Sequence, residues 1–156
     1  MQEILKNYPP AAELSLKNLA ALTQERLFTP IVKDLYAEFV RNGTNQALVE
    51  ILNQIPTEQH LPILHTLTTH VTKEKPVFIY GIGIGNSIDI NKARFVAAST
   101  DLLWCLSLMV DDIIDRDHFR ADKKTAWRIY GEQTTYKSAD IAFQTLQGLK
   151  VEICWA

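Results

Sequence analysis

The sequence has few residues that would cross-link, bend or stiffen the chain. Its 156 residues include two cysteines, six glycines and six prolines. Neither Cys105 nor Cys154 lies in a CxxC spacing, so we expect two buried, reduced thiols and neither a disulfide nor a metal site. The hydrophobic content of 47% is that of a globular protein and argues against a disordered or collagen-like chain.

The sequence also lacks an excess of charge and an uninterrupted apolar run. Sixteen basic and eighteen acidic residues leave a formal net charge of −2, which provides no broad electrostatic surface for nucleic acid. Charged residues from Asp89 to Asp111 interrupt the most apolar third, so we expect no transmembrane segment. The first residues lack the basic and apolar regions of a signal peptide. We therefore expect a cytoplasmic protein with a single domain over residues 1–156.

Apolar residues recur at helical spacing through almost the whole chain, which predicts an all-α fold. Helices are expected in residues 14–27, 31–40, 48–55 and 61–71, then over residues 91–114 and about 134–155. The 91–114 helix is apolar on several faces and is therefore expected to be central.

Residues 77–85 combine a strand-like beginning with three alternating glycines. A dinucleotide-binding loop requires glycines at the first, third and sixth positions. Counted from Gly81 the sixth residue is Asn86, and counted from Gly83 it is Ile88, so neither register fits. We predict a helix that ends in a glycine-rich turn.

Three carboxylates gather at the end of the long apolar helix. Asp111 and Asp115 share one helix face, with Asp112 about 100° around the axis. Like charges at this spacing repel, and the C-terminal end of a helix favours cations, so the placement lowers stability. Mg²⁺ would reverse both effects because it binds carboxylates and substrate phosphates. The alternative is a solvated helix end with Arg116 and Lys123 as counter-ions.

Arg120 favours the metal site over that alternative. A guanidinium five residues after Asp115 is suited to a diphosphate whose other oxygens are held by magnesium. The DDIID motif followed by Arg120 resembles the first aspartate-rich motif of the trans-isoprenyl diphosphate synthases, the polyprenyl synthetase family, with its pattern DDxxD-x4-RRG-x-P-T.

The resemblance extends over about residues 72–147. Thr125, Tyr130-Gly131 and Asp140 match further positions of the family. It implies an all-α isoprenoid synthase-type helical bundle around a deep apolar cavity, of which this chain would form the incomplete, N-terminal half.

The resemblance also implies metal-dependent prenyl transfer from an allylic isoprenyl diphosphate. In the family, Mg²⁺ (Mn²⁺ is a possible substitute) assists loss of the diphosphate, and isopentenyl diphosphate attacks the allylic cation. By position, Asp111, Asp112 and Asp115 would bind the metal. Asp111, Asp112 and Arg120 would be catalytic, and Arg120 and Lys75 would bind substrate.

The isopentenyl diphosphate half of the family site is largely absent. Its four basic positions read Thr72, Lys75, Trp104 and Ala121 here, so that only Lys75 keeps a charge, without the fork of an arginine. The second aspartate-rich motif of the family is expected beyond residue 200. We therefore expect a truncated or partial chain that binds diphosphate without turnover.

Three functions stay open. The first is a relative of the isoprenyl diphosphate synthases that acts on an allylic diphosphate. The second is a class I terpene synthase on the same fold, in which Trp104 could present its ring to a carbocation. The third is a non-catalytic, degenerate subunit or helical interaction domain. Helical pairing would give a homodimer, or a heterodimer with a complete synthase.

Overall fold

The computed structural model describes residues 44–69 and 74–149. These residues are mostly helical, as the periodicity predicts, and include one two-stranded hairpin. The elements are α4 (Thr44–Leu52), the 3-10 helix η1 (Thr57–Gln59), α5 (His60–Thr69), α6 (Glu74–Gly85), α7 (Ile90–Ile114), β1 (Phe119–Arg120), β2 (Lys123–Lys124), α8 (Ala126–Tyr130) and α9 (Glu132–Gly148). The helices expected over 14–27 and 31–40, and Cys154, lie outside the described residues.

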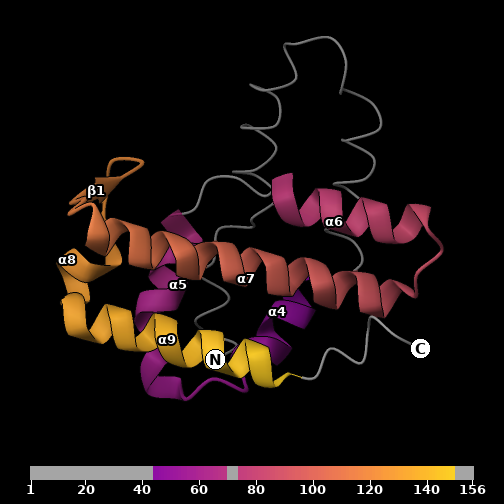
Figure 1. The fold of residues 1–156 in the computed structure, drawn as a ribbon, viewed down its shortest axis with the longest axis horizontal. Helices are drawn as coiled ribbons and strands as arrows, with labels where there is room; N and C mark the ends of the chain where they lie inside the picture. Colours follow the sequence, from indigo (N-terminus) through magenta and orange to yellow (C-terminus); the bar gives the residue numbers. More distant parts are fainter. Residues whose placement is uncertain (1–43, 70–73, 150–156) are drawn as a thin grey trace, which may run out of the picture.

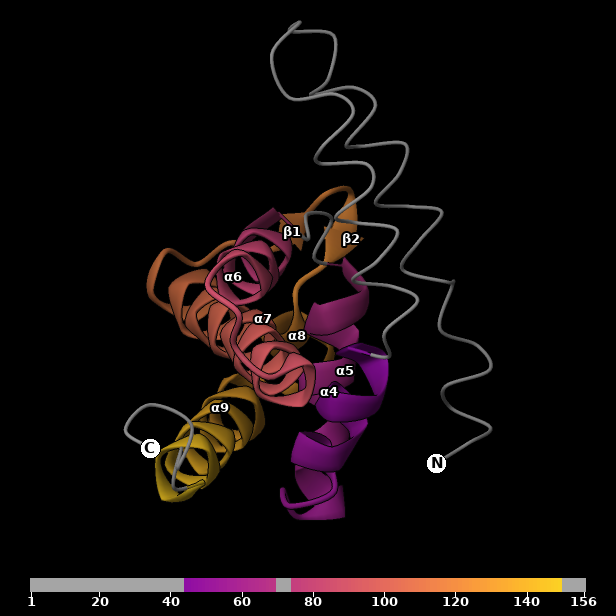
Figure 2. The same ribbon diagram turned by 90° about the vertical axis from the view of Figure 1, so that its right-hand side faces the viewer.

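Helix α7 is central to the described structure. In Figure 1, α6 and α9 lie on opposite sides of α7, and α9 returns antiparallel to it, while Figure 2 places α4 and α5 on a further side. α7 contacts α4, α5, α6, α8 and α9. Apolar residues of α4, α5, α7 and α9 form one buried cluster that includes Ile51, Ile63, Leu102, Cys105 and Met109. Cys105 is buried, as expected.

Local hydrogen bonds define both ends of α7. The Asp89 carboxylate accepts from two backbone N–H groups of the first turn, at 3.0 and 3.1 Å. At the other end, Arg116 adopts a left-handed φ of 58°, and the N–H of Asp117 donates to the carbonyl oxygen of Asp112 at 2.9 Å. This closure is a Schellman motif with arginine where glycine is usual. It turns the chain back directly after the acidic residues.

The glycine-rich segment forms helix α6, as predicted in part: the helix runs through all three glycines to Gly85, where a glycine-rich turn was expected. Pro76 lies in its first turn, where the missing N–H has no helical partner to lose. A Cβ atom at Gly83 would lie 3.0 Å from the Cβ of Ala93. This glycine therefore serves the close packing of α6 on α7, and the segment is no phosphate loop.

The structure departs from the sequence prediction after α7. Neither the hairpin nor the short helix α8 was expected, because two-residue strands show no alternation and five helical residues show little periodicity. Strands β1 and β2 pair antiparallel, with Arg120 opposite Lys123. Helix α9 ends at Gly148, earlier than expected, since Leu149 is extended (φ −64°, ψ 90°).

Helix α7 is also long and apolar enough, by length and composition alone, to cross a membrane, which differs from the expected absence of such a segment. Half of its most apolar window is buried within the fold, against other helices. A buried core helix meets the same criterion, so this property by itself does not indicate a membrane span.

Candidate functional site

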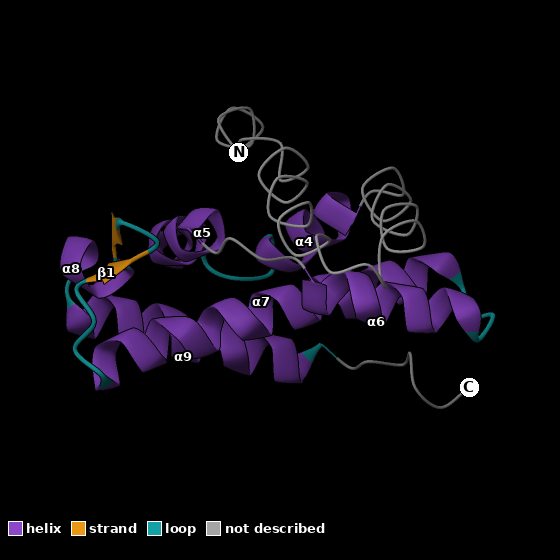
Figure 3. Cartoon of the chain, turned by 90° about the horizontal axis from the view of Figure 1, so that it is seen from above, coloured by secondary structure: helices purple, strands orange, loops and turns teal. Residues whose placement is uncertain are grey.

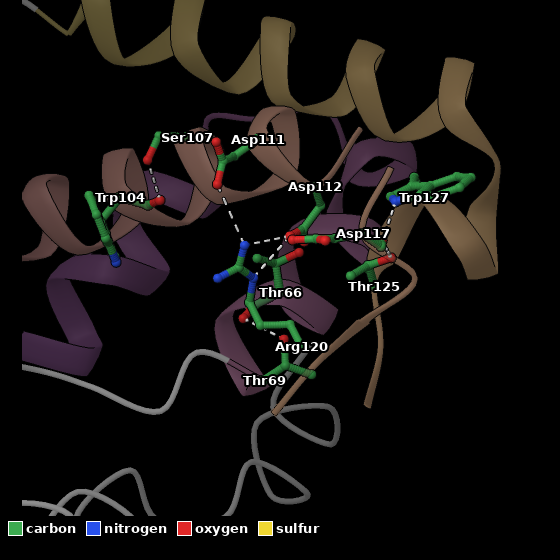
Figure 4. A network of polar contacts seen from close by, with 10 residues as sticks. All are labelled: Thr66, Thr69, Trp104, Ser107, Asp111, Asp112, Asp117, Arg120, Thr125 and Trp127. Carbon is green, nitrogen blue, oxygen red and sulfur yellow. Dashed lines mark hydrogen bonds and ion pairs between the residues drawn. The ribbon is translucent and has the colours of Figure 1, made fainter. Parts of the chain in front are cut away.

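The acidic end of α7 faces the β1–β2 hairpin, which carries Arg120 (Figure 4). The guanidinium donates two hydrogen bonds to Oδ1 of Asp112, from Nη2 at 2.6 Å and from Nε at 3.0 Å. Nη2 also lies 3.6 Å from Oδ2 of Asp111. One positive charge therefore serves two adjacent carboxylates.

The two carboxylates differ in exposure. The side chain of Asp112 is 4% exposed and that of Asp111 is 57% exposed. Burial raises the pKa of the Asp112 carboxyl group, although the hydrogen bond and charge of Arg120 act in the opposite direction. The hydrogen bond to Asp112 raises the pKa of Arg120, so its guanidinium stays charged. Asp112 is thus the buried member of the pair, and Asp111 is open to solvent.

Asp115 lies one helical turn after Asp111, at the end of α7. It is the exposed C-cap residue of α7. Within residues 44–69 and 74–149, no three histidine, cysteine, aspartate or glutamate side chains converge to hold a metal ion. The donor set still suits Mg²⁺, which is commonly bound by one or two carboxylates together with substrate phosphates. Metal binding by Asp111, Asp112 and Asp115 stays a prediction.

The hairpin turn that presents Arg120 has a left-handed backbone. Its two residues, Ala121 and Asp122, have φ values of 49° and 61°. Asp122 stands where the family pattern has glycine, and aspartate is among the few other residues that tolerate this conformation. Alanine is not, so Ala121 adds strain to the turn.

Side chains from α5, α8 and the N-cap residue of α8 hold the hairpin in place. Thr125 Oγ1 and Trp127 Nε1 both donate to the carbonyl oxygen of Asp117, at 2.8 and 2.7 Å. His65 of α5 donates from Nε2 to the carbonyl oxygen of Lys124 at 2.6 Å. Contacts at both ends of the hairpin therefore determine where Arg120 lies.

An apolar groove of about 410 Å³ lies between α7 and α9, which run side by side in Figures 1 and 3. Four exposed apolar side chains line it: Leu103, Ile114, Tyr136 and Phe143. Asp111 lines the same groove, as does Asp140 of α9. A second hollow of about 240 Å³ adjoins it and shares Leu103 and Phe143. The groove therefore leads away from the acidic pair along the two helices.

The structure brings together some of the predicted site residues. Asp111, Asp112 and Arg120 are in contact, whereas Asp115 lies at the helix end. Lys75 lies in the first turn of α6. Arg116, which the alternative of a solvated helix end assigned as a counter-ion to the aspartates, pairs with Glu132 at 2.5 Å.

The family resemblance implied an apolar cavity, but the sequence analysis did not place this groove between α7 and α9, and it missed the contact of His65. The groove had a signal, because Leu103, Val110 and Ile114 form a second apolar stripe at helical spacing on α7. The contact of His65 had no signal in the sequence, because its acceptor is a backbone carbonyl oxygen 59 residues away.

Comparison with known proteins identifies the family of the chain. The polyprenyl synthetase family model matches residues 45–152, well over half of the chain. A 62-residue segment is 36% identical to "Heptaprenyl diphosphate synthase component 2" of Bacillus subtilis (strain 168) and covers 40% of this chain and 18% of that relative. No solved structure matches the chain. By its match over 45–152, the chain belongs to the polyprenyl synthetase family.

Proposed function

We propose that this chain binds the diphosphate of an allylic isoprenyl diphosphate together with Mg²⁺, as the allylic half of a polyprenyl synthetase site. The supporting observation is the position of Arg120 against Asp111 and Asp112, next to an apolar groove that Asp111 also lines. A charged head and an apolar chain are the two parts of such a substrate. The charged head would lie at Arg120 and the acidic pair, and the apolar chain would lie in the groove.

The acidic residues would bind the metal ion that accompanies the head group, and Arg120 would bind the phosphate oxygens. Asp111 and Asp112, with Asp115, would hold Mg²⁺ or Mn²⁺, because their oxygens are the donors that such ions prefer. The bound metal would stabilise negative charge on the departing diphosphate. Arg120 would exchange Asp112 for phosphate oxygens, since a guanidinium fork binds carboxylate and phosphate alike.

The groove would take the prenyl chain. Burying apolar surface stabilises a complex by about 25 cal/mol per Å². Leu103, Ile114 and Phe143 are 42–71% exposed in the described structure, so a prenyl chain has apolar surface to cover. A chain lying there would also exclude water from Asp111, which would strengthen the attraction of the bound metal ion for both the carboxylate and the diphosphate.

We propose that isopentenyl diphosphate is bound weakly or not at all. Ala121, at a position where the family has arginine, forms the hairpin turn and offers no side-chain donor. This favours binding of one substrate without condensation. The cyclase alternative draws no support from Trp104, because this residue is not among those that line the groove.

A second polypeptide is a reasonable partner. The Bacillus relative is named as a component of a synthase. We extend this to the present chain as a proposal, with a second copy or a complete synthase as the partner. Such a partner would cover apolar side chains that the described residues leave exposed, such as Leu61 and Ile82, at 58% and 59%.

Thermal unfolding tests the proposal directly. The full chain is compared alone, with Mg²⁺, with Mg²⁺ plus a non-hydrolysable farnesyl diphosphate analogue, and with Mg²⁺ plus isopentenyl diphosphate. A ligand at 100 times its Kd adds about 2.7 kcal/mol to the free energy of unfolding, which raises the Tm by several degrees. We expect this shift with the farnesyl analogue and not with isopentenyl diphosphate.

Two variants and a control complete the test. Asp112→Asn and Arg120→Gln should each remove most of the shift. Asp122→Asn, which changes an exposed carboxylate on the same hairpin, should retain it. A folded wild-type protein that shifts with neither diphosphate would contradict the proposal and favour the non-catalytic subunit.

A further inference from the structure

His65 links helix α5 to the hairpin that carries Arg120. Its Nε2 donates to the carbonyl oxygen of Lys124 at 2.6 Å, and its ring meets Tyr130 of α8 edge to face, with centroids 6.1 Å apart. Because a carbonyl oxygen can only accept, the proton must lie on Nε2. The function proposed above does not use this side chain.

The hairpin needs such an external contact. Each of its strands has two residues, and an isolated two-stranded hairpin is marginally stable in water. The positive φ of Ala121 in the turn lowers that stability further. Interactions with neighbouring helices must therefore maintain the hairpin.

The pairing of β1 with β2 connects the His65 contact to Arg120. Lys124 pairs with Phe119, and the adjacent Lys123 pairs with Arg120. Fixing the carbonyl of Lys124 fixes β2, and β2 in turn fixes β1. The backbone of Arg120 is thereby held where its guanidinium reaches Asp112.

We propose that His65 is a positioning residue for diphosphate binding: its hydrogen bond to Lys124 holds the β1–β2 hairpin so that Arg120 reaches the diphosphate. The inference rests on the proposed function. His65 acts through Arg120 alone and touches neither the diphosphate nor the acidic pair.

A double-mutant cycle separates this role from a general structural one. Affinity for the non-hydrolysable farnesyl diphosphate analogue with Mg²⁺ is measured by calorimetry for wild type, His65→Phe, Arg120→Gln and the double variant. Phenylalanine keeps an aromatic ring beside Tyr130 but has no donor. His65→Gln, whose amide nitrogen can replace Nε2 as the donor, provides the rescue. Circular dichroism and thermal unfolding confirm that each variant is folded.

The expected result is non-additive. His65→Phe should weaken binding about three- to tenfold, the effect of one lost hydrogen bond. In the Arg120→Gln background the same change should have less than about a twofold effect, since the side chain it positions is gone. His65→Gln should bind nearly as tightly as wild type.

Other outcomes overturn the inference in distinguishable ways. Equal losses in both backgrounds would assign His65 a general structural role, and no loss in either would show that Arg120 is positioned without it. If the wild-type protein itself does not bind the analogue, the proposed function fails, and the positioning role fails with it.

Discussion

Asp111 and Asp112 are neighbours in one motif, yet they meet different surroundings. Asp112 is buried and receives two hydrogen bonds from Arg120, whereas Asp111 is exposed and lies 3.6 Å from the same guanidinium. Helical spacing predicted that the acidic residues would cluster at the end of α7. It could not predict which one turns inward, because that depends on the position of a hairpin without a sequence signal.

This asymmetry predicts unequal effects on stability. Arg120→Gln should lower the free energy of unfolding by about 1–2 kcal/mol, because the buried Asp112 loses charge-assisted hydrogen bonds. Asp111→Asn should change it by less than about 0.5 kcal/mol, as expected for an exposed ion pair. Urea unfolding of both variants without ligand measures the difference, and equal losses would show that burial does not separate the two carboxylates.

At the scale of elements, the helices were predictable and the hairpin was not. Apolar periodicity located α4, α5, α7 and α9, because each buries one side against the shared core. The hairpin turn has Ala121-Asp122 in place of the Asn-Gly or Asp-Gly that would have indicated it. Helix α6 was predicted, but the reason for its glycines appears only in its packing against α7.

Two glycines of α6 provide a test of that packing. Gly83→Val should lower the free energy of unfolding by about 1–3 kcal/mol, because new atoms would crowd Ala93. Gly85 has open space around it, so Gly85→Ala should be neutral or stabilising by up to about 1 kcal/mol. Thermal unfolding measures both. Similar destabilisation at the two positions would contradict close packing as the role of Gly83.

At the scale of the whole molecule, α7 packs into the core on several sides and leaves another apolar side facing the groove beside α9. The sequence indicated that this helix is apolar on several faces. It did not indicate which faces neighbouring helices would cover, since that depends on contacts distant in the chain. The groove and the acidic pair meet at Asp111, so one helix presents both surfaces.

Under the proposed function, the groove should affect only ligands with a prenyl chain. Leu103→Arg should weaken binding of the farnesyl diphosphate analogue about tenfold, because apolar contact is lost and a charge is introduced. Binding of inorganic pyrophosphate should be unchanged. Leu61→Arg on α5, another exposed leucine outside the groove, is the control. Calorimetry with both ligands measures the effect, and equal weakening of both would indicate that the groove is not the chain-binding surface.

Because Arg120 pairs with Asp112, its guanidinium would compete with a metal ion for the carboxylate under the proposed function. A divalent cation that arrives alone must share these oxygens with a guanidinium or displace it. A cation that arrives with a diphosphate brings a new acceptor for that guanidinium, so the displaced hydrogen bonds are re-formed elsewhere. Metal and diphosphate would thus each favour the binding of the other, and by linkage the two effects would be equal in free energy.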